Sequence, residues 1–232
     1  MERVLILCAM TLGPACAAAH PHVFVDTELR VQVDGNGMLT GVELVWEYDD
    51  LYSLLLFEDM GLDPDGDGRL NPEEEARLAG FDMNWIEGYE GDLYLRTDQE
   101  SIVLGPPQPR ETTVVNARIR TVHYRSVDPV PADAVKIRAY DPTFYTAYDL
   151  KSVTASGACS TQIKEADIDA AFALTEKLIG EMAADADEDA YPEVGEAFAS
   201  TVVVSCVNCS GRVWPHSPRW PYGFGRWAAW PM

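Results

Sequence analysis

Residues 23–48 read VFVDTELRVQVDGNGMLTGVELVWEY, and this stretch indicates two β-strands joined by a tight turn. Apolar and polar residues alternate from Val23 to Val33, which is typical of a strand with one buried face. Residues 34–37, Asp-Gly-Asn-Gly, are a strong turn signal, and residues 39–48 read as the second strand. We therefore expect the chain to open with a long antiparallel hairpin.

The rest of the chain combines one helical insertion with further strands. Residues 50–90 form the insertion, with helices expected at 50–58 and from 72 onward, and residues 81–89 expected to continue the second helix or to form another short one. The later strands are predicted at residues 92–96, 101–104, 111–124, 134–140, 151–164 and 201–206, and the later helices at 167–182 and 194–199. This order indicates an α+β fold, with antiparallel β-sandwich-like sheets in a single domain over residues 20–206.

Residues 63–74 of the insertion fill every position of an EF-hand calcium loop. The expected Ca²⁺ ligands are Asp63, Asp65, Asp67, Arg69 through its backbone carbonyl, Asn71 and Glu74. Gly68 allows the sharp turn at the sixth position, and Leu70 is the apolar residue that such loops turn inward. The alternative is an acidic surface turn that binds no metal.

A second acidic stretch resembles such a loop less well. Carboxylates recur at the first, third, fifth and last loop positions in Asp185, Asp187, Asp189 and Glu196. Ala190 replaces the turn glycine and Pro192 occupies the apolar position, and both oppose the loop geometry. We interpret this stretch as an acidic linker.

The two ends of the chain differ from the domain between them. Residues 1–19 have a short charged start, an apolar run and a small-residue end, as in a signal peptide that is removed on export. Residues 207–232 hold four of the six tryptophans, three arginines and no acidic residue. For this tail we expect an extension without regular structure, and the alternative is an anchor at a membrane interface.

Charge and cysteine content limit the partners and the compartment. The chain has 38 acidic and 17 basic residues, and its net charge of −21 argues against nucleic acid and anionic lipid as partners. Three cysteines follow the signal peptide, and we expect a disulfide between Cys159 and Cys206. Cys206 and Cys209 have a CxxC spacing, which is a weak indication of a redox or metal site.

The predicted mature chain begins with His20-Pro21-His22. Pro21 has no amide hydrogen and blocks the square-planar amino-terminal chelate, so the amine and two imidazoles would suit Zn²⁺, Cu²⁺ or Ni²⁺. Asp26 shares a strand face with His22 and is a candidate ligand beside it. The alternative is a structural or unordered terminus.

His123 lies in a predicted strand and could complete such a site, with Asp141 or Asp49 as a carboxylate ligand. A hydrogen-bonded structural histidine is the alternative. Residues 46–52 and 141–148 are both aromatic and acidic, and they are candidates for a carbohydrate or peptide groove or for core aromatics beside turns. We find no nucleophile elbow, P-loop, dinucleotide fingerprint or HExxH helix, so we expect no enzymatic activity.

Several of these segments together resemble the DUF1007 family of exported bacterial proteins. They are residues 20–26, 52–55, 80–85 and 140–145 and the late Cys206. The resemblance implies a periplasmic component of a transport system that works beside an inner-membrane permease of the nickel/cobalt type. We therefore expect a periplasmic accessory protein for nickel, cobalt or zinc transport, braced by a calcium ion. The alternative is a calcium-stabilised extracytoplasmic binding module for a glycan or envelope protein.

Overall fold

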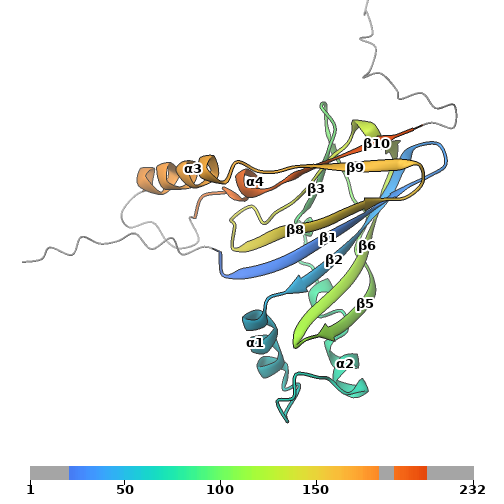
Figure 1. The fold of residues 1–232 in the computed structure, drawn as a ribbon. Helices are drawn as coiled ribbons and strands as arrows, with labels where there is room; N and C mark the ends of the chain where they lie inside the picture. Colours follow the sequence, from blue (N-terminus) through green and yellow to red (C-terminus); the bar gives the residue numbers. More distant parts are fainter. Residues whose placement is uncertain (1–20, 183–190, 208–232) are drawn as a thin grey trace, which may run out of the picture.

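The computed structural model describes residues 21–182 and 191–207, which form two five-stranded sheets with helices at their ends (Figure 1). The first sheet has the strand order β5-β6-β2-β1-β8, and the second has the order β4-β3-β7-β10-β9. The strands are β1 (Val23–Val33), β2 (Met38–Tyr48), β3 (Leu93–Arg96), β4 (Ser101–Ile102), β5 (Gln108–Val115), β6 (Arg118–Pro131), β7 (Lys136–Ala139), β8 (Thr146–Ala155), β9 (Cys159–Lys164) and β10 (Thr201–Cys206). The expected α+β class is confirmed, and the sheets are mostly antiparallel.

The predicted hairpin is the centre of the first sheet. β1 pairs antiparallel with β2, and the turn between them is held by Asp34, whose Oδ1 accepts hydrogen bonds from the amides of Asn36 and Met38, both at 2.8 Å. The odd-numbered residues of β1 are buried and its even-numbered residues are more exposed, as the alternating pattern predicted. On its other side β1 pairs parallel with β8.

Both sheets contribute to one hydrophobic core, which explains why they form a single unit. Leu29 and Leu44 come from the first sheet, and Leu95, Ile137 and Val202 come from the second; each is at most 1% exposed. Residues of the insertion join the same core. Burial of this much apolar surface is the dominant favourable contribution to folding.

Two predicted strands were wrong in extent, because each contains a turn that the sequence pattern hides. The strand expected at 111–124 is the hairpin of β5 and β6, with Asn116 (φ 52°) and Ala117 (φ 63°) in the left-handed region. Alanine is not typical of a tight turn, so the sequence pattern predicted one continuous strand across this position. The strand expected at 151–164 is divided into β8 and β9 by a turn that contains Gly157.

The helical segments are α1 (Asp50–Met60), α2 (Pro72–Leu78), a 3-10 turn η1 (Phe81–Met83), α3 (Ile168–Glu181) and α4 (Gly195–Phe198), with a second 3-10 turn η2 (Ala132–Ala134). The helix expected at 81–89 is therefore only one short turn. α1 and α2 lie at the end of the first sheet near β5 and β6 (Figure 1). None of the helices in the described part of the chain is long and apolar enough to cross a bilayer.

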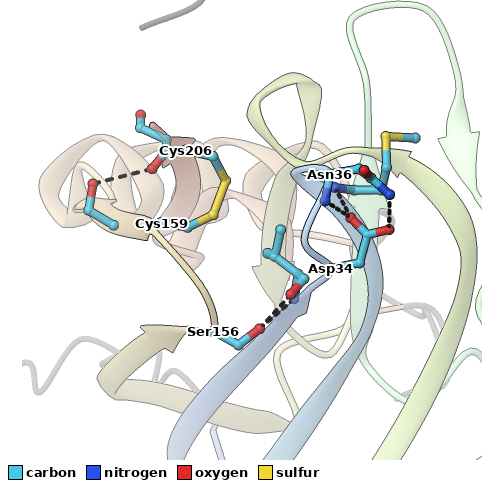
Figure 2. Close-up of a disulfide and its surroundings, with 9 residues drawn as sticks. Asp34, Asn36, Ser156, Cys159 and Cys206 are labelled. Atoms are coloured by element: carbon cyan, nitrogen blue, oxygen red, sulfur yellow. Dashed lines mark hydrogen bonds between the residues drawn. A yellow bond between two sulfur atoms is a disulfide. The ribbon is translucent and has the colours of Figure 1, made fainter. Parts of the chain in front are cut away.

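The predicted disulfide between Cys159 and Cys206 is present (Figure 2). The two cysteines are direct partners across β9 and β10, with Cα atoms 4.0 Å apart. The bond joins the two ends of the segment 159–206, which contains α3 and α4. Since the sulfur of Cys206 is used here, it is not free to form a CxxC site with Cys209, which lies outside the described residues.

Candidate functional site

The loop at residues 63–74 joins α1 to α2, so it has a helix on each side. Asp63, Asp65 and Asp67 each place a carboxylate oxygen such that all three atoms lie within 4.8 Å of one another. Within residues 21–182 and 191–207 no other group of three His, Cys, Asp or Glu ligand atoms is this close. Three oxygens at this separation match the carboxylate part of a hard-cation site.

Backbone hydrogen bonds fix the shape of this loop. The two carboxylate oxygens of Asp63 accept hydrogen bonds from the amides of Asp67 and Gly68, both at 3.0 Å. Gly68 has a φ of 74°, so the turn uses the left-handed conformation that glycine adopts most easily. Leu70 is partly buried against the hydrophobic core, as its loop position predicted.

The end of the loop is also the start of α2. The Asn71 side chain accepts hydrogen bonds from the amides of Glu73 and Glu74, and Glu74 Oε2 accepts one from the Asn71 amide at 2.9 Å. This capping box turns the side chain of Glu74, a residue that is 9% exposed, back toward Asn71 at the end of the loop. The same two residues are the predicted ligands at the ninth and last positions.

The three aspartates repel one another electrostatically. The pKa of Asp65 is raised, first by its side-chain hydrogen bond with Asp63 and then by the negative charge of Asp67. A bound divalent cation would remove this repulsion, because it lies between the carboxylates. The three aspartates could therefore hold a metal ion, whereas Glu74 is not part of the group whose oxygens lie within 4.8 Å of one another.

The predicted amino-terminal histidine site is only partly described. His20 and the predicted signal peptide lie outside the described residues. His22 is exposed, and its ring centroid lies 4.8 Å from that of Tyr145. Asp26 forms ion pairs with Arg118 and Lys151, each at 3.2 Å, so its carboxylate is already engaged by two cations.

His123 is fully buried and is not brought to His22. Its ring makes edge contacts with Trp46 and Trp85, at centroid distances of 4.6 and 5.9 Å. Burial, with a smaller effect from Arg125, lowers its pKa to about 4. Neither ring nitrogen has a hydrogen-bond partner among the described residues, so the alternative of a hydrogen-bonded structural histidine is not observed either, and the ring is a buried polar group without a hydrogen bond there.

The two other carboxylates suggested as partners of His123 have local structural roles. Asp49 caps α1 by accepting a hydrogen bond from the Tyr52 amide, and its second oxygen accepts one from the Phe24 amide. Asp141 accepts hydrogen bonds from both the amide and the hydroxyl of Thr143 at 2.9 Å. In the second acidic stretch, residues 185–189 are outside the described part, while Glu196 pairs with Arg138 at 2.6 Å.

A cavity of about 650 Å³ lies where the two aromatic-acidic segments meet the end of the insertion and the start of β3. Its lining is almost entirely aromatic, acidic or small. The residues are Val23, Trp46, Tyr48, Tyr52, Asp82, Gly88, Tyr89, Glu90, Asp92, Tyr94, Asp141, Pro142, Thr143, Tyr145, Thr146, Tyr148 and Glu193. Residues 46–52 and 141–148 thus do line a common cavity, although they are far apart in the sequence.

Two carboxylates of the cavity, the buried Asp92 and the partly buried Asp82, accept hydrogen bonds from hydroxyl groups. Asp92 Oδ2 accepts hydrogen bonds from Tyr148 at 2.7 Å and Tyr89 at 2.8 Å, and burial raises the pKa of Asp92 to about 6. Asp82 Oδ2 accepts hydrogen bonds from Thr121 at 2.7 Å and Tyr48 at 3.1 Å, and burial raises its pKa as well.

Sequence reasoning missed Asp82 and Asp92 as cavity residues. The sequence feature that could have pointed to Asp92 is its position directly after Gly91 and before an apolar strand. It has a φ of 51°, a conformation that aspartate adopts more readily than most residues. For Asp82 no local pattern distinguishes it from the other acids of the insertion.

Comparisons with known proteins add information on the family. No curated protein matches the sequence. Among solved structures, the acetylcholine-binding protein type 1 of Biomphalaria glabrata is 12% identical, with 83% of this chain and 88% of that chain covered. Its TM-score of 0.28 is too low to assign a shared fold. The family model described as "Protein of unknown function (DUF1007)" matches residues 5–206, which include both sheets, the loop and the cavity, so the chain belongs to the DUF1007 family.

Proposed function

We propose that the protein is an exported, non-enzymatic accessory protein that handles divalent transition metals for an inner-membrane permease, with a calcium ion in the loop at 63–74. The observation that carries the proposal is the convergence of Asp63, Asp65 and Asp67 between two helices. The calcium ion would connect α1 to α2 and brace the insertion. In an extracytoplasmic compartment a Kd of about 10⁻⁴–10⁻³ M would suffice for this structural role.

The transition metal would bind at the amino terminus. His22 is exposed, and its amide donates a hydrogen bond to the carbonyl of the cavity residue Tyr145 at 2.8 Å, so His22 lies beside the cavity. The cation candidates are Ni²⁺, Co²⁺ and Zn²⁺, which imidazole ligands suit. His123 has no part in this proposal, because it is buried in the core.

Calorimetric titration of the chelator-treated mature protein tests both metals. We expect Asp63→Ala to lose Ca²⁺ binding only, and a His20→Ala/His22→Ala double variant to lose Ni²⁺ or Zn²⁺ binding only. Asp59→Asn, an exposed acid of α1 just outside the loop, is the matched charge control for the loop. Wild-type protein that binds no transition metal more tightly than about 10⁻⁴ M would end the metal-handling proposal.

A second candidate function is an extracytoplasmic binding module for a glycan or an envelope protein, which the cavity of about 650 Å³ favours. Aromatic side chains beside carboxylates can stack on sugars and accept hydrogen bonds from their hydroxyl groups. Retention on glycan arrays that depends on the half-exposed Tyr145 would support this candidate. A cavity variant with an unchanged retention profile would contradict it.

A further inference from the structure

The aromatic-acidic cavity has a buried floor and an accessible rim. Trp46, Tyr48 and Asp92 are between 3% and 7% exposed, whereas Tyr89 is 38% and Tyr145 49% exposed. The volume of about 650 Å³ lies within the roughly 300–1,000 Å³ range of small-molecule sites. A ligand could therefore enter past the two outer tyrosines and contact the buried floor.

All the charged residues that line the cavity are acidic. Its acidic residues are Asp82, Glu90, Asp92, Asp141 and Glu193, and the lining contains no lysine, arginine or histidine. None of these five carboxylates takes part in an ion pair within 4.0 Å in the described residues. Such a cavity disfavours phosphates, nucleotides and carboxylic acids, because each would add negative charge to a partly buried negative site.

Arg125 contacts the cavity residue Glu90 through the backbone carbonyl of Glu90 rather than through a carboxylate. The Arg125 guanidinium donates hydrogen bonds to the backbone carbonyls of Gly105 and Glu90, at 2.6 and 2.7 Å. It also lies over the ring of Trp85 at 4.7 Å. It therefore leaves the carboxylate of Asp92 without a direct counter-ion.

The walls of the cavity are suited to a cation of low charge density. Seven aromatic rings line it, and several contact one another; Trp46 and Tyr148 have centroids 5.5 Å apart, and Tyr48 stacks on Tyr52 at 5.1 Å. The faces of such rings attract ammonium groups by cation–π interaction, which is strongest where water is excluded. A sugar would use the same rings and could donate hydrogen bonds to the acids, but it carries no positive charge to offset theirs.

The arrangement of oxygens argues against a bare metal ion here. In the described residues the cavity acids do not gather three ligand oxygens within 4.8 Å, in contrast to the loop at 63–74. On Asp92, both tyrosine hydroxyls bind Oδ2, while Oδ1 accepts no hydrogen bond from the described residues. One oriented carboxylate with an open oxygen, surrounded by rings, matches a polyatomic cation.

We propose that this cavity binds an organic ammonium ion, with Asp92 as its counter-ion and the rings of Trp46, Tyr48 and Tyr148 as its aromatic walls. Tyr89 and Tyr145 form the entrance. The proposal is independent of the calcium loop and of the amino-terminal histidines, and it gives the protein a second kind of cationic ligand.

Calorimetry and tryptophan fluorescence of the full mature chain test this site with two ammonium probes, choline and putrescine. The neutral isosteres 3,3-dimethylbutan-1-ol and 1,4-butanediol are the matched ligand controls. We expect saturable binding of at least one probe, about tenfold or more tighter than its isostere. Asp92→Asn should weaken this binding about tenfold, because asparagine keeps the left-handed backbone and the hydrogen bonds but lacks the charge.

Three further variants keep the test decisive. Tyr145→Ala changes only the rim and should also weaken binding, whereas Asp98→Asn, an exposed acid paired with Lys136, should not. Asp63→Asn and chelator treatment should leave probe binding unchanged, which separates this result from the calcium proposal. The proposal is overturned if neither probe saturates at about 10 mM, or if the isosteres bind as tightly as the ammonium ions.

Discussion

The hydroxyl group of Tyr148 donates a 2.7 Å hydrogen bond to Asp92, across 56 positions of sequence. With Tyr89 it orients a carboxylate that is only 5% exposed and lies at the floor of the cavity. Burial raises the pKa of this carboxyl to about 6. The folded protein therefore holds a charge there at neutral pH at a cost in stability.

We predict that Asp92→Asn stabilises the protein in a pH-dependent manner. The folded-state pKa of about 6 is above the ordinary value of 3.8, so the folded state binds more protons between these values and its stability falls as pH rises. The gain of the variant over wild type should grow by about 2 kcal/mol between pH 4 and pH 7. Urea unfolding at the two pH values measures it, and a gain that is constant with pH would contradict the assignment.

The buried His123 should make the protein sensitive to acid. Its folded-state pKa of about 4 lies below the ordinary 6.5, so the unfolded state binds more protons and stability is lost as pH falls through this window. At pH 5 the loss relative to pH 8 is about 2 kcal/mol. A His123→Phe variant keeps the ring contact with Trp46 and should lose less stability on acidification, as urea unfolding at pH 8 and pH 5 would show. His22→Phe, at an exposed position, is the control.

Calcium should stabilise the protein through Glu74. At a calcium concentration 100-fold above Kd, the free energy of unfolding should rise by about 2.7 kcal/mol. Glu74→Gln keeps the hydrogen bond to the Asn71 amide but loses the bidentate carboxylate, so calcium affinity should fall about tenfold or more. The neighbouring exposed Glu73 provides the control Glu73→Gln. Equal calcium affinity of the two variants would show that Glu74 serves only as a helix cap.

Reduction of the disulfide should destabilise the segment 159–206, which contains α3 and α4. The cysteines are 47 residues apart, and a bond that closes a loop of this length stabilises by roughly 4 kcal/mol in the chain-entropy model, with about 2–4 kcal/mol typical. We expect a Cys159→Ser/Cys206→Ser variant to show this loss in urea unfolding. Addition of reductant should lower the stability of wild type but not of the variant.

The parts of the molecule that were predictable are those encoded locally. The β1–β2 hairpin follows from alternation around a glycine-rich turn, and the closeness of Asp63, Asp65 and Asp67 follows from their spacing. The hairpin at Asn116 and Ala117 was missed because alanine rarely adopts the left-handed conformation that Ala117 has here. Tertiary contacts impose that conformation.

The cavity was predictable only in part, because its residues come from distant segments. Residues 46–52 and 141–148 carry a visible excess of aromatic and acidic residues. Asp82 and Asp92 became identifiable only when folding placed them beside Tyr48 and Tyr148. The burial of His123 likewise depends on β2 and β5 lying on either side of β6.

The parallel pairing of β1 with β8 has a consequence for how the chain folds. Ser156 exchanges two hydrogen bonds with the backbone of Val33, 123 positions away (Figure 2). Until β8 has been synthesised, one edge of β1 has no partner and can join strands of other chains. Contacts between such remote segments also slow folding, because the intervening loop must close first. The first strand of the domain can therefore complete its pairing only after β8 is available. A chain that is kept unfolded until synthesis is complete would not expose the unpaired edge of a folded β1.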